Sequence, residues 1–217
     1  MTSPTQSFQQ RLKGLYLLTD HDLLGNRLLS AVEQGLAGGA RLIQYRDKTQ
    51  DHKRRQHEAQ ELRILCTRFD SLLIINDDIE LAQAVNADGV HLGRDDSAPA
   101  HVRALLGFSR IIGVSCYNSV ARAMAAAQAG ADYIAFGSFY TSQVKPSAVQ
   151  ASIDLIPNAR AQMALPIAAI GGIHSDNAKL LIDAGADMIA VVHGVFAQPS
   201  IQRAAQKLVS LFEECSK

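Results

Sequence analysis

The sequence predicts an α/β fold: a single (β/α)8 TIM barrel domain over residues 1–217, with residues 1–13 as an N-terminal extension. Short apolar runs rich in β-branched residues alternate with longer amphipathic runs from end to end. The apolar runs number eight, which is the tally of a (β/α)8 barrel. A short phrase, Gly or Asn followed by Ala and a charged residue, also recurs before strands, as in Gly130-Ala131-Asp132. Such repetition is typical of the helix-to-strand turns at one face of a barrel.

The expected elements follow one another at similar intervals. The strands are Leu15–Leu18, Leu42–Tyr45, Leu72–Ile75, Gly89–Leu92, Ile111–Val114, Tyr133–Phe136, Ile167–Ile170 and Met188–Val192. The helical runs include Asn26–Ala37, His52–Phe69, Ala98–Leu106, Val120–Ala129, Asp176–Ala184 and Ile201–Glu214. Gly38, Gly107, Gly130 and Gly185 come just after helical runs, where a left-handed residue ends a helix. Asn86, which opens one copy of the phrase, also tolerates that conformation.

A doubly wound open sheet is the competing fold, because it is also built from βα units. The count of eight units argues against it. The first strand is also followed by Thr19-Asp20-His21 and not by the GxGxxG of a dinucleotide-binding sheet. These two observations favour the barrel.

Composition limits the partners that we expect. The formal net charge is +0, so no overall field recruits nucleic acid or an anionic membrane. The N-terminal segment lacks the apolar run of a signal peptide, and no stretch reaches the roughly 18 apolar residues of a membrane span. Cys66, Cys116 and Cys215 are widely spaced and form no CxxC pair, as expected of reduced thiols. We therefore expect a soluble cytoplasmic protein.

The second strand ends in a group of basic and polar residues, Gln44-Tyr45-Arg46-Asp47-Lys48. Because strand side chains alternate, Gln44, Arg46 and Lys48 should share the face toward the barrel mouth, while Tyr45 faces the helices. A guanidinium and an ammonium group both suit phosphate oxygens. The pattern alone leaves a second interpretation equally open, in which these residues are a solvated strand end.

Acidic residues follow the third and fourth strands. Asn76-Asp77-Asp78 and Asp95-Asp96 each precede a helical run, so one residue of each group could be a helix N-cap. Sequential strands are expected to be neighbours, which would bring the remaining carboxylates together. Mg²⁺ favours one or two carboxylates combined with substrate phosphate oxygens. We therefore expect a magnesium site next to the basic strand end.

Two further strand ends carry candidate anion-binding groups. Ser115 lacks a G-x-S-x-G elbow, so its hydroxyl is expected to donate to a phosphate or to cap a helix. Gly171-Gly172 follows the seventh strand, where barrels often bind phosphate through backbone N–H groups. Ser175-Asp176 is expected to cap the next helix. The mouth would then hold two phosphorylated substrates or one substrate with two phosphates.

Taken in order, these motifs resemble those of the thiamine-phosphate synthase family. The similarity runs from Leu15 to about Phe196. The matching segments are Gln44-Tyr45-Arg46-Asp47-Lys48, Ile75-Asn76-Asp77, Ala87-Asp88-Gly89-Val90-His91-Leu92-Gly93, Asp96, Gly113-Val114-Ser115, Gly137 to Lys145 and Ile170-Gly171-Gly172-Ile173. Each motif is modest alone, whereas the ordered set is specific.

The resemblance implies that the chain joins a hydroxymethylpyrimidine diphosphate to a thiazole phosphate and releases pyrophosphate. The C–O bond to pyrophosphate would break first, and the thiazole nitrogen would capture the pyrimidine methyl cation. The implied substrate-binding residues are Gln44, Tyr45, Arg46, Asp47, Lys48, Asn76, Ser115, Ser142, Gln143, Val144, Lys145, Gly172, Val192 and His193. Arg46, Lys48, Ser115 and Lys145 would be catalytic, and Asp77 and Asp96 would hold Mg²⁺.

The chain departs from the family pattern at three places. Arg94-Asp95-Asp96 replaces the usual Gln-Glu-Asp, Val144 replaces a Thr, and His193 replaces a common Ser. Losing one neutral hydrogen bond at Val144 would weaken binding by about 1 kcal/mol. Two alternatives stay open. One is an isomerase like the related thiazole tautomerase, in which we would expect the diphosphate and metal residues to be lost, and the other is a non-catalytic barrel that binds thiamine precursors, at which Val144 and His193 hint. A homodimer is also left open.

Overall fold

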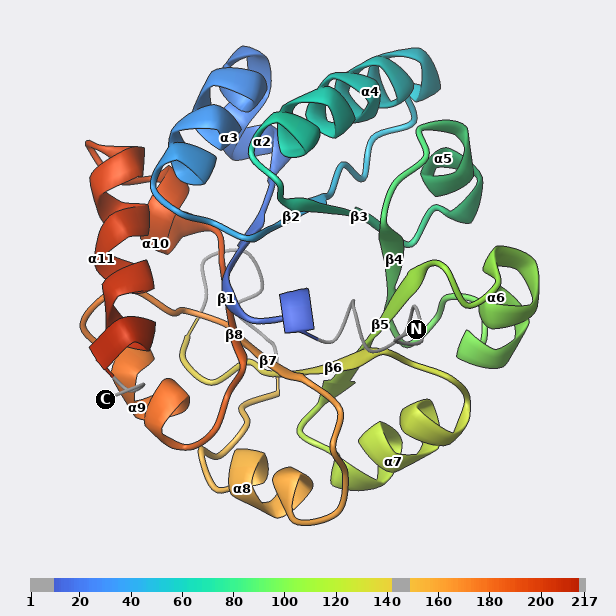
Figure 1. The fold of residues 1–217 in the computed structure, drawn as a ribbon, viewed down its shortest axis with the longest axis vertical. Helices are drawn as coiled ribbons and strands as arrows, with labels where there is room; N and C mark the ends of the chain where they lie inside the picture. The colour runs from blue at the N-terminus through green and yellow to red at the C-terminus, as the bar shows by residue number, and fades with distance from the viewer. Residues whose placement is uncertain (1–9, 142–148, 215–217) are drawn as a thin grey trace.

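The computed structural model describes residues 10–141 and 149–214 and shows a closed barrel of parallel strands. The strands pair in chain order, and the last pairs with the first (Figure 1). The strands are β1 (Gly14–Leu18), β2 (Leu42–Tyr45), β3 (Leu72–Asn76), β4 (Gly89–Leu92), β5 (Ile111–Tyr117), β6 (Tyr133–Phe136), β7 (Ile167–Ile170) and β8 (Met188–Val191). The predicted (β/α)8 barrel is therefore confirmed, and the open sheet is excluded.

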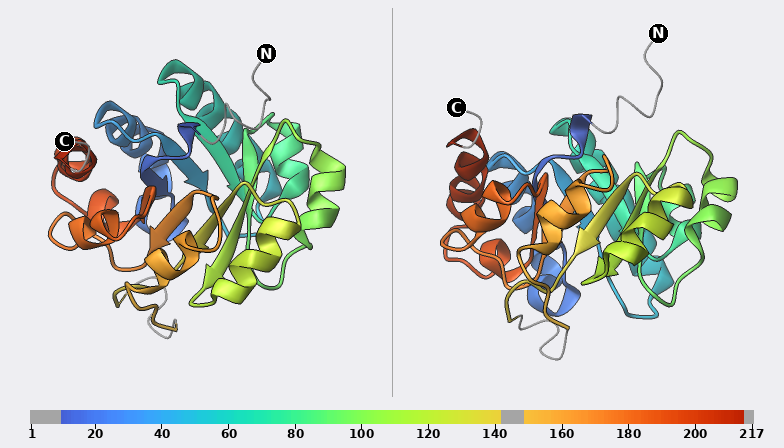
Figure 2. Two further views of the ribbon diagram at one scale, coloured as in Figure 1. Left: turned by 60° about the horizontal axis from the view of Figure 1, so that its bottom comes forward. Right: turned by 90° about the horizontal axis from the view of Figure 1, so that it is seen from below.

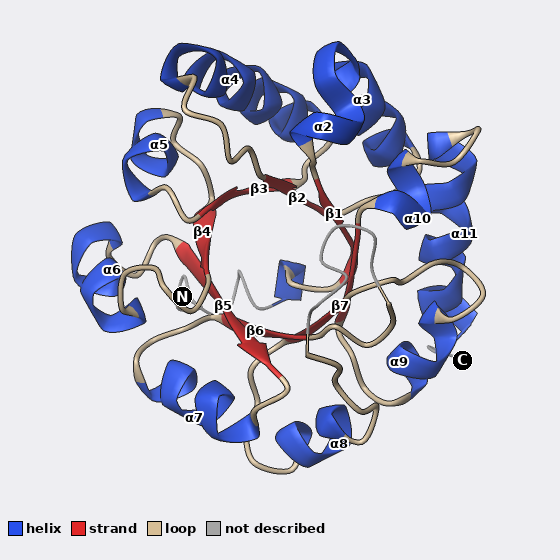
Figure 3. Ribbon diagram, turned by 180° about the vertical axis from the view of Figure 1, so that it is seen from behind, coloured by secondary structure: helices blue, strands red, loops and turns tan. Residues whose placement is uncertain are grey.

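Helices surround this ring of strands, as Figure 3 shows. They are α2 (His21–Leu24), the 3-10 helix η1 (Gly25–Arg27), α3 (Leu28–Ala37), α4 (His52–Arg68), α5 (Ile79–Ala84), α6 (Pro99–Leu106), α7 (Val120–Gln128), α8 (Leu155–Arg160), α9 (Ala178–Asp183), α10 (His193–Phe196) and α11 (Ile201–Glu214). Among these helices none has the length and apolar character of a membrane span. Cys66 and Cys116 are buried free thiols, and Cys215 lies outside the described residues.

Each strand is buried on two sides, so its side chains divide between two hydrophobic clusters. On β2, Leu42 belongs to the cluster inside the barrel, whereas Ile43 and Tyr45 belong to the cluster between strands and helices. Gln44 hydrogen-bonds to Tyr16, a member of the inner cluster. The alternation predicted for the second strand is therefore confirmed.

The segment before β1 closes one end of the barrel. Leu12 is only 1% exposed and packs with the inner cluster. Figure 1 shows this short segment within the ring of strands, and Figure 2 places it at the end where the strands begin. Residues 10–13 are therefore the floor of the barrel, and the open mouth lies at the carboxyl ends of the strands.

Three Asp–Arg pairs, here called the bottom joints, connect strands and helices at the floor end. The pairs are Asp88 with Arg63, Asp132 with Arg103, and Asp187 with Arg160. Each carboxylate also accepts a backbone N–H of the preceding strand, from Leu73, Ile112 and Ile167 respectively. The recurring Ala-Asp phrase therefore encodes a joint between neighbouring strands and the helix packed beside them.

The predicted helix ends are confirmed with one correction. The left-handed conformation is found at Asn86, Gly107, Gly130 and Gly185. Gly38 instead has φ −81°, and Gly39 has φ 96°. The helix keeps its conformation through the residue after its last turn, so the left-handed residue comes one position later.

Candidate active site

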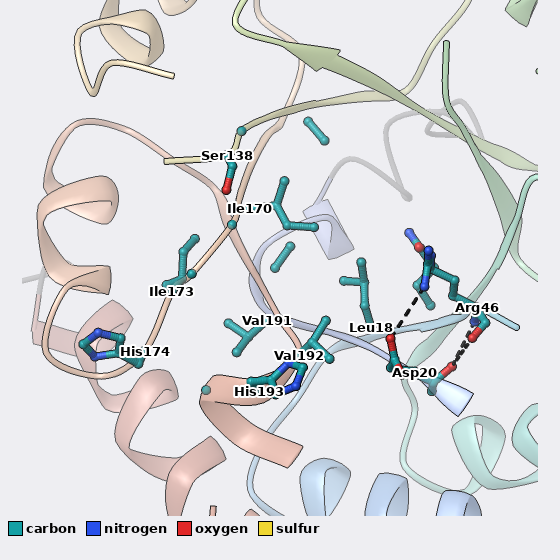
Figure 4. Close-up of a pocket in the computed structure, with 18 of the residues that line it drawn as sticks. Leu18, Asp20, Arg46, Ser138, Ile170, Ile173, His174, Val191, Val192 and His193 are labelled. Carbon is teal, nitrogen blue, oxygen red and sulfur yellow. Dashed lines mark hydrogen bonds and ion pairs between the residues drawn. The ribbon is translucent and has the colours of Figure 1, made fainter. Parts of the chain in front are cut away.

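A pocket of about 470 Å³ opens at the mouth of the barrel. Predicted site residues from opposite sides of the barrel line it, namely Gln44, Arg46, Asn76, Ser115, Gly172, Val192 and His193. Figure 4 shows Arg46 and Asp20 on one side of this pocket, and His174 with Val192 and His193 on another. The structure thus places residues from the two predicted anion-binding sides of the mouth in one pocket. The predicted residues Ser142, Gln143, Val144 and Lys145 lie outside the described residues.

Arg46 is held at the pocket wall by residues that follow β1. Its backbone N–H donates to Thr19 Oγ1 over 2.9 Å. Its guanidinium Nη1 lies 3.7 Å from Asp20 Oδ2, and the Asp20 side chain also accepts Leu23 N–H at the start of α2 (Figure 4). Asp20 is the counter-charge that the β2 sequence alone does not reveal. At 3.7 Å the ion pair is long, so Arg46 keeps donor capacity for a ligand.

Lys48 and Asp77 meet at the same edge of the mouth. Lys48 Nζ lies 3.0 Å from Asp77 Oδ2. Asp78 takes the N-cap role for α5, because its carboxylate accepts Leu81 N–H over 2.9 Å. Asp77 has the left-handed φ of 62°, and its carboxylate pairs with Lys48. The ambiguity in the sequence is resolved, because the cap and the candidate metal ligand are different residues.

Asp96 completes an acidic pair with Asp77. Its Oδ2 accepts the backbone N–H of Gly93 over 2.5 Å. Burial and the adjacent Asp77 carboxyl raise the pKa of Asp96, against the opposing effect of Lys48. Two carboxylates this close repel each other when both are ionised, and a divalent cation would relieve that repulsion. The donor set of the site therefore fits Mg²⁺, and the predicted convergence of β3 and β4 carboxylates is confirmed.

Tyr45 and Asp47 lie behind β2 and do not line the pocket. Tyr45 Oη donates to Glu58 Oε2 over 2.7 Å, and Asp47 Oδ2 lies 2.7 Å from Arg54 Nη2. The Asp47 side chain is 1% exposed. Burial opposes its ionisation, yet hydrogen bonds from Thr49 and the Arg54 charge lower the pKa of Asp47 overall. These two predicted site residues therefore anchor the loop that carries Arg46 and Lys48.

The same network contains the metal-type ligands His21, Asp47 and Glu58, whose ligand atoms lie within 4.8 Å of one another. Arg54 lies among them, with Nη1 2.7 Å from His21 Nδ1 and 3.2 Å from Glu58 Oε1. A guanidinium therefore already supplies the positive charge that these carboxylates need. The Mg²⁺ candidate remains the Asp77–Asp96 pair.

Ser115 faces the pocket from β5, which continues past the predicted end at Val114 to Tyr117. Its Oγ lies 2.8 Å from His91 Nε2. The N-cap of α7 is Ser119, whose Oγ accepts Arg122 N–H over 3.2 Å. Ser115 is therefore not the helix cap that was the alternative to phosphate binding.

Glycines allow the loops of the opposite wall to pack closely. Gly172 has φ 62°, and a Cβ there would lie 2.8 Å from Tyr140 Cβ and even closer to Thr141 O. A Cβ at Gly194 would likewise overlap the carbonyl oxygen of Ile173. The loops after β6, β7 and β8 therefore hold one another beside His193. Gly194 is a packing residue that the sequence argument did not single out.

The predicted cap Ser175-Asp176 is wrong. Asn177 is the N-cap residue of α9, and it has no side-chain cap hydrogen bond. Its side chain turns back instead, accepting His174 N–H over 2.9 Å and donating to Gly172 O over 3.1 Å. The helix consequently starts at Ala178, after a turn that fixes the glycine loop.

The fold and site define the class. It is a (β/α)8 barrel with a mouth pocket lined by the Arg46 guanidinium, together with the Lys48 ammonium group and the carboxylates of Asp77 and Asp96, which do not line the pocket. The family model described as thiamine monophosphate synthase matches residues 15–195. The chain therefore belongs to the thiamine monophosphate synthase family.

Individual relatives agree with this assignment. The thiamine-phosphate synthase of Thiobacillus denitrificans is 50% identical over 199 residues, which are 92% of this chain and 94% of the relative. That of Thioalkalivibrio sulfidiphilus is 49% identical over 205 residues, covering 94% and 97% of the two chains. The solved structure of thiamine phosphate pyrophosphorylase from Pyrococcus furiosus has a TM-score of 0.88 and 32% identity, covering 95% of this chain and 98% of that one.

Proposed function

We propose that this chain condenses hydroxymethylpyrimidine diphosphate with thiazole phosphate to give thiamine phosphate and pyrophosphate. The observation that carries the proposal is the group of Arg46, Lys48, Asp77 and Asp96 at the mouth of a barrel of this family. Relatives of about half identity named thiamine-phosphate synthase support it. An isomerase acting on the thiazole alone would have no use for this cluster.

Arg46, Lys48 and Ser115 are the proposed diphosphate-binding groups. Arg46 and Lys48 would exchange part of their contact with Asp20 and Asp77 for phosphate oxygens, to which charged donors bind strongly. Asp77 and Asp96 would hold Mg²⁺. When bound, Mg²⁺ neutralises charge on the oxygens of the leaving diphosphate. Lys145 belongs to the same proposal, although it lies outside the described residues.

The thiazole phosphate is proposed to bind on the opposite wall. Gly172 and His193 line the pocket there. The glycine lets backbone approach a phosphate oxygen closely, and a histidine ring N–H can donate one hydrogen bond in either protonation state. Ser142 to Val144 are assigned to the same substrate on the resemblance alone. The two substrates would then face each other across the barrel axis.

The chemistry asks the protein for charge stabilisation and positioning. The C–O bond breaks with both electrons going to the diphosphate, and the thiazole nitrogen lone pair then forms the new bond to the pyrimidine methyl carbon. No proton is removed in either step, so no general base is required. Arg46 and Lys48 stabilise the leaving polyanion. Apolar pocket walls from Leu18, Ile170 and Val191 would limit attack on the cation by water.

The direct test supplies both precursors with Mg²⁺ and follows thiamine phosphate and pyrophosphate. Equal amounts of both products are the expected result. Isomerisation of the thiazole without the diphosphate would identify an isomerase instead. Binding of thiazole phosphate with neither product would identify a non-catalytic precursor-binding barrel. Removal of Mg²⁺ by a chelator should stop product formation, and added Mg²⁺ should restore it.

Neighbouring aspartates provide a matched pair of variants. Asp77→Ala should reduce turnover by about 100-fold or more, because it removes a ligand of the ion that neutralises the leaving group. Asp78→Ala should lower the free energy of unfolding by about 1 kcal/mol, the usual effect of losing an N-cap, while keeping turnover. Equal turnover in the two variants would contradict the metal assignment.

A further inference from the structure

Five polar side chains form a continuous hydrogen-bonded path across the inside of the barrel, here called the interior chain. Its members in order are Gln44, Tyr16, Tyr133, His91 and Ser115. The distances are 2.7 Å from Gln44 Nε2 to Tyr16 Oη and 2.8 Å between the two phenol oxygens. They are 2.9 Å from Tyr133 Oη to His91 Nδ1 and 2.8 Å from His91 Nε2 to Ser115 Oγ. Gln44 and Ser115, the two ends, line the pocket, and His91 lines it as well.

When the Gln44 amide nitrogen faces Tyr16, the hydrogen bonds of the interior chain can all run in one direction. An amide nitrogen only donates, so Tyr16 accepts from Gln44, and its own proton is then available to Tyr133. Burial raises the pKa of both phenols, so both keep their protons. Tyr133 then donates to His91 Nδ1, which leaves the ring proton on Nε2 as the donor to Ser115. The Ser115 proton is therefore available to a ligand in the pocket.

The opposite direction has the opposite chemistry at Ser115. It would require the Gln44 amide to turn so that its oxygen accepts from Tyr16. Ser115 would then donate to His91 Nε2 and offer only lone pairs to the pocket. Phosphate oxygens of a diphosphate also offer lone pairs alone, so this direction would repel the ligand. An anion at Ser115 therefore selects the direction that starts at the Gln44 N–H group.

Resting on the proposed function, we propose that Tyr133 and His91 are positioning residues that hold Ser115 as a hydrogen-bond donor to the diphosphate. They act through Ser115 and not by contact with the reacting atoms. The same alignment leaves the Gln44 side-chain oxygen as an acceptor at the other end. The part of the ligand that faces Gln44 should therefore carry an N–H or O–H group.

The tautomer of His91 is the first test, and its main measurement is made on the protein with both phenols present. Nitrogen-15 NMR of histidine-labelled protein bound to Mg²⁺ and pyrophosphate should show neutral His91 with its proton on Nε2. The His91→Gln variant assigns the resonance. In Tyr133→Phe the donor to Nδ1 is gone, so the signal should shift toward the Nδ1-protonated form. A wild-type His91 protonated on Nδ1 alone would overturn the proposal.

Binding of Mg²⁺ and pyrophosphate, measured by calorimetry, is the second test. Ser115→Ala should weaken binding about tenfold, the value of a hydrogen bond to a charged group. Tyr133→Phe should weaken binding to a similar extent. The double variant Ser115→Ala/Tyr133→Phe should bind no more weakly than Ser115→Ala alone. Tyr16→Phe removes the same atom from the neighbouring phenol but leaves the link from Tyr133 through His91 intact. Its effect should be several-fold smaller.

The outcomes separate the two proposals. If Ser115→Ala binds pyrophosphate as tightly as wild type, the diphosphate site of the proposed function is wrong. If Ser115→Ala weakens binding and Tyr133→Phe does not, the interior chain is wrong and the proposed function stands. Additive losses in the double variant would likewise overturn the interior chain. Circular dichroism and urea unfolding would check that each variant is folded.

Discussion

Arg103 is expected to contribute more to stability than its counterparts in the other two bottom joints. The side chains of Arg103 and Asp132 are 9% and 11% exposed. The corresponding values are 20% and 21% for Arg63–Asp88, and 35% and 35% for Arg160–Asp187. Removing the cation from a buried pair leaves a carboxylate without its counter-charge in a medium that solvates it poorly. The penalty should therefore follow the burial of the pair.

The structure also sets the size of the effect. Arg103 donates to the carbonyl groups of Gly107, Arg110 and Gly130 in addition to Asp132. Arg103→Ala should lower the free energy of unfolding by about 3–5 kcal/mol, the range for a broken buried pair. Arg160→Ala should lower it by about 1 kcal/mol, nearer the value of an exposed pair. Arg63→Ala should fall between the two.

Urea unfolding at pH 7 tests this order. The chain has no tryptophan, so far-UV circular dichroism is the suitable signal. The double variant Arg103→Ala/Asp132→Asn should recover part of the loss, because it removes the unpaired charge whose pKa burial raises. Equal losses at the three joints, or the largest loss at Arg160, would refute the reasoning from burial.

Three further predictions follow from the geometry. Gly172→Ala should raise KM for thiazole phosphate severalfold, because the added Cβ displaces the loop carrying Thr141. Gly107 has a similar φ but open space around it, so Gly107→Ala should only lower the free energy of unfolding by about 1 kcal/mol. Equal KM values for Gly172→Ala and Gly107→Ala would contradict the packing argument. Asp47 contributes stability above its unfolded pKa of about 3.9, and this contribution is lost as pH falls through its lower folded pKa. The free energies of unfolding of Asp47→Asn and wild type should therefore become equal in acid. A difference between them that does not change with pH would disprove this. Burial raises the pKa of both Cys66 and Cys116 to about 12. Iodoacetamide at pH 8 should therefore label them only after unfolding, as mass spectrometry would show. Rapid labelling of the native protein would contradict their burial.

The fold could be predicted because its signals are local. Periodicity of two on β2 gives the correct faces for Gln44 and Tyr45 without any knowledge of neighbouring strands. Strand limits were less predictable, as at β5, where the pairing shifts between Ser115 and Tyr117. A bulge of this kind depends on the partner strand and leaves no period in the sequence. The predicted cap of α9 was wrong for a related reason, because the Asn177 side chain accepts the backbone N–H of His174, which precedes it in the chain.

The candidate site could be predicted only where the sequence of a single strand end is enough to identify a residue. Arg46, Asp77 and Asp96 are visible as charges after apolar runs. The pairing of Arg46 with Asp20 is not visible, because it depends on the register between β1 and β2. The family motif also suggests a ligand role for Asp47 by adjacency, although alternation turns it toward Arg54. An inward polar residue such as Tyr16 was detectable in principle, but its partners were not.

Arg54 gives the loop after β2 a fixed positive charge inside the cluster of His21, Asp47 and Glu58. A metal ion in that position could be withdrawn by a competing chelator, whereas a guanidinium is part of the polymer. If the proposed function is correct, loss of magnesium would empty the site at Asp77 and Asp96, whereas Arg54 would still hold the loop that carries Arg46. Under that proposal the protein would stay folded without the ion, and adding magnesium back would by itself restore activity.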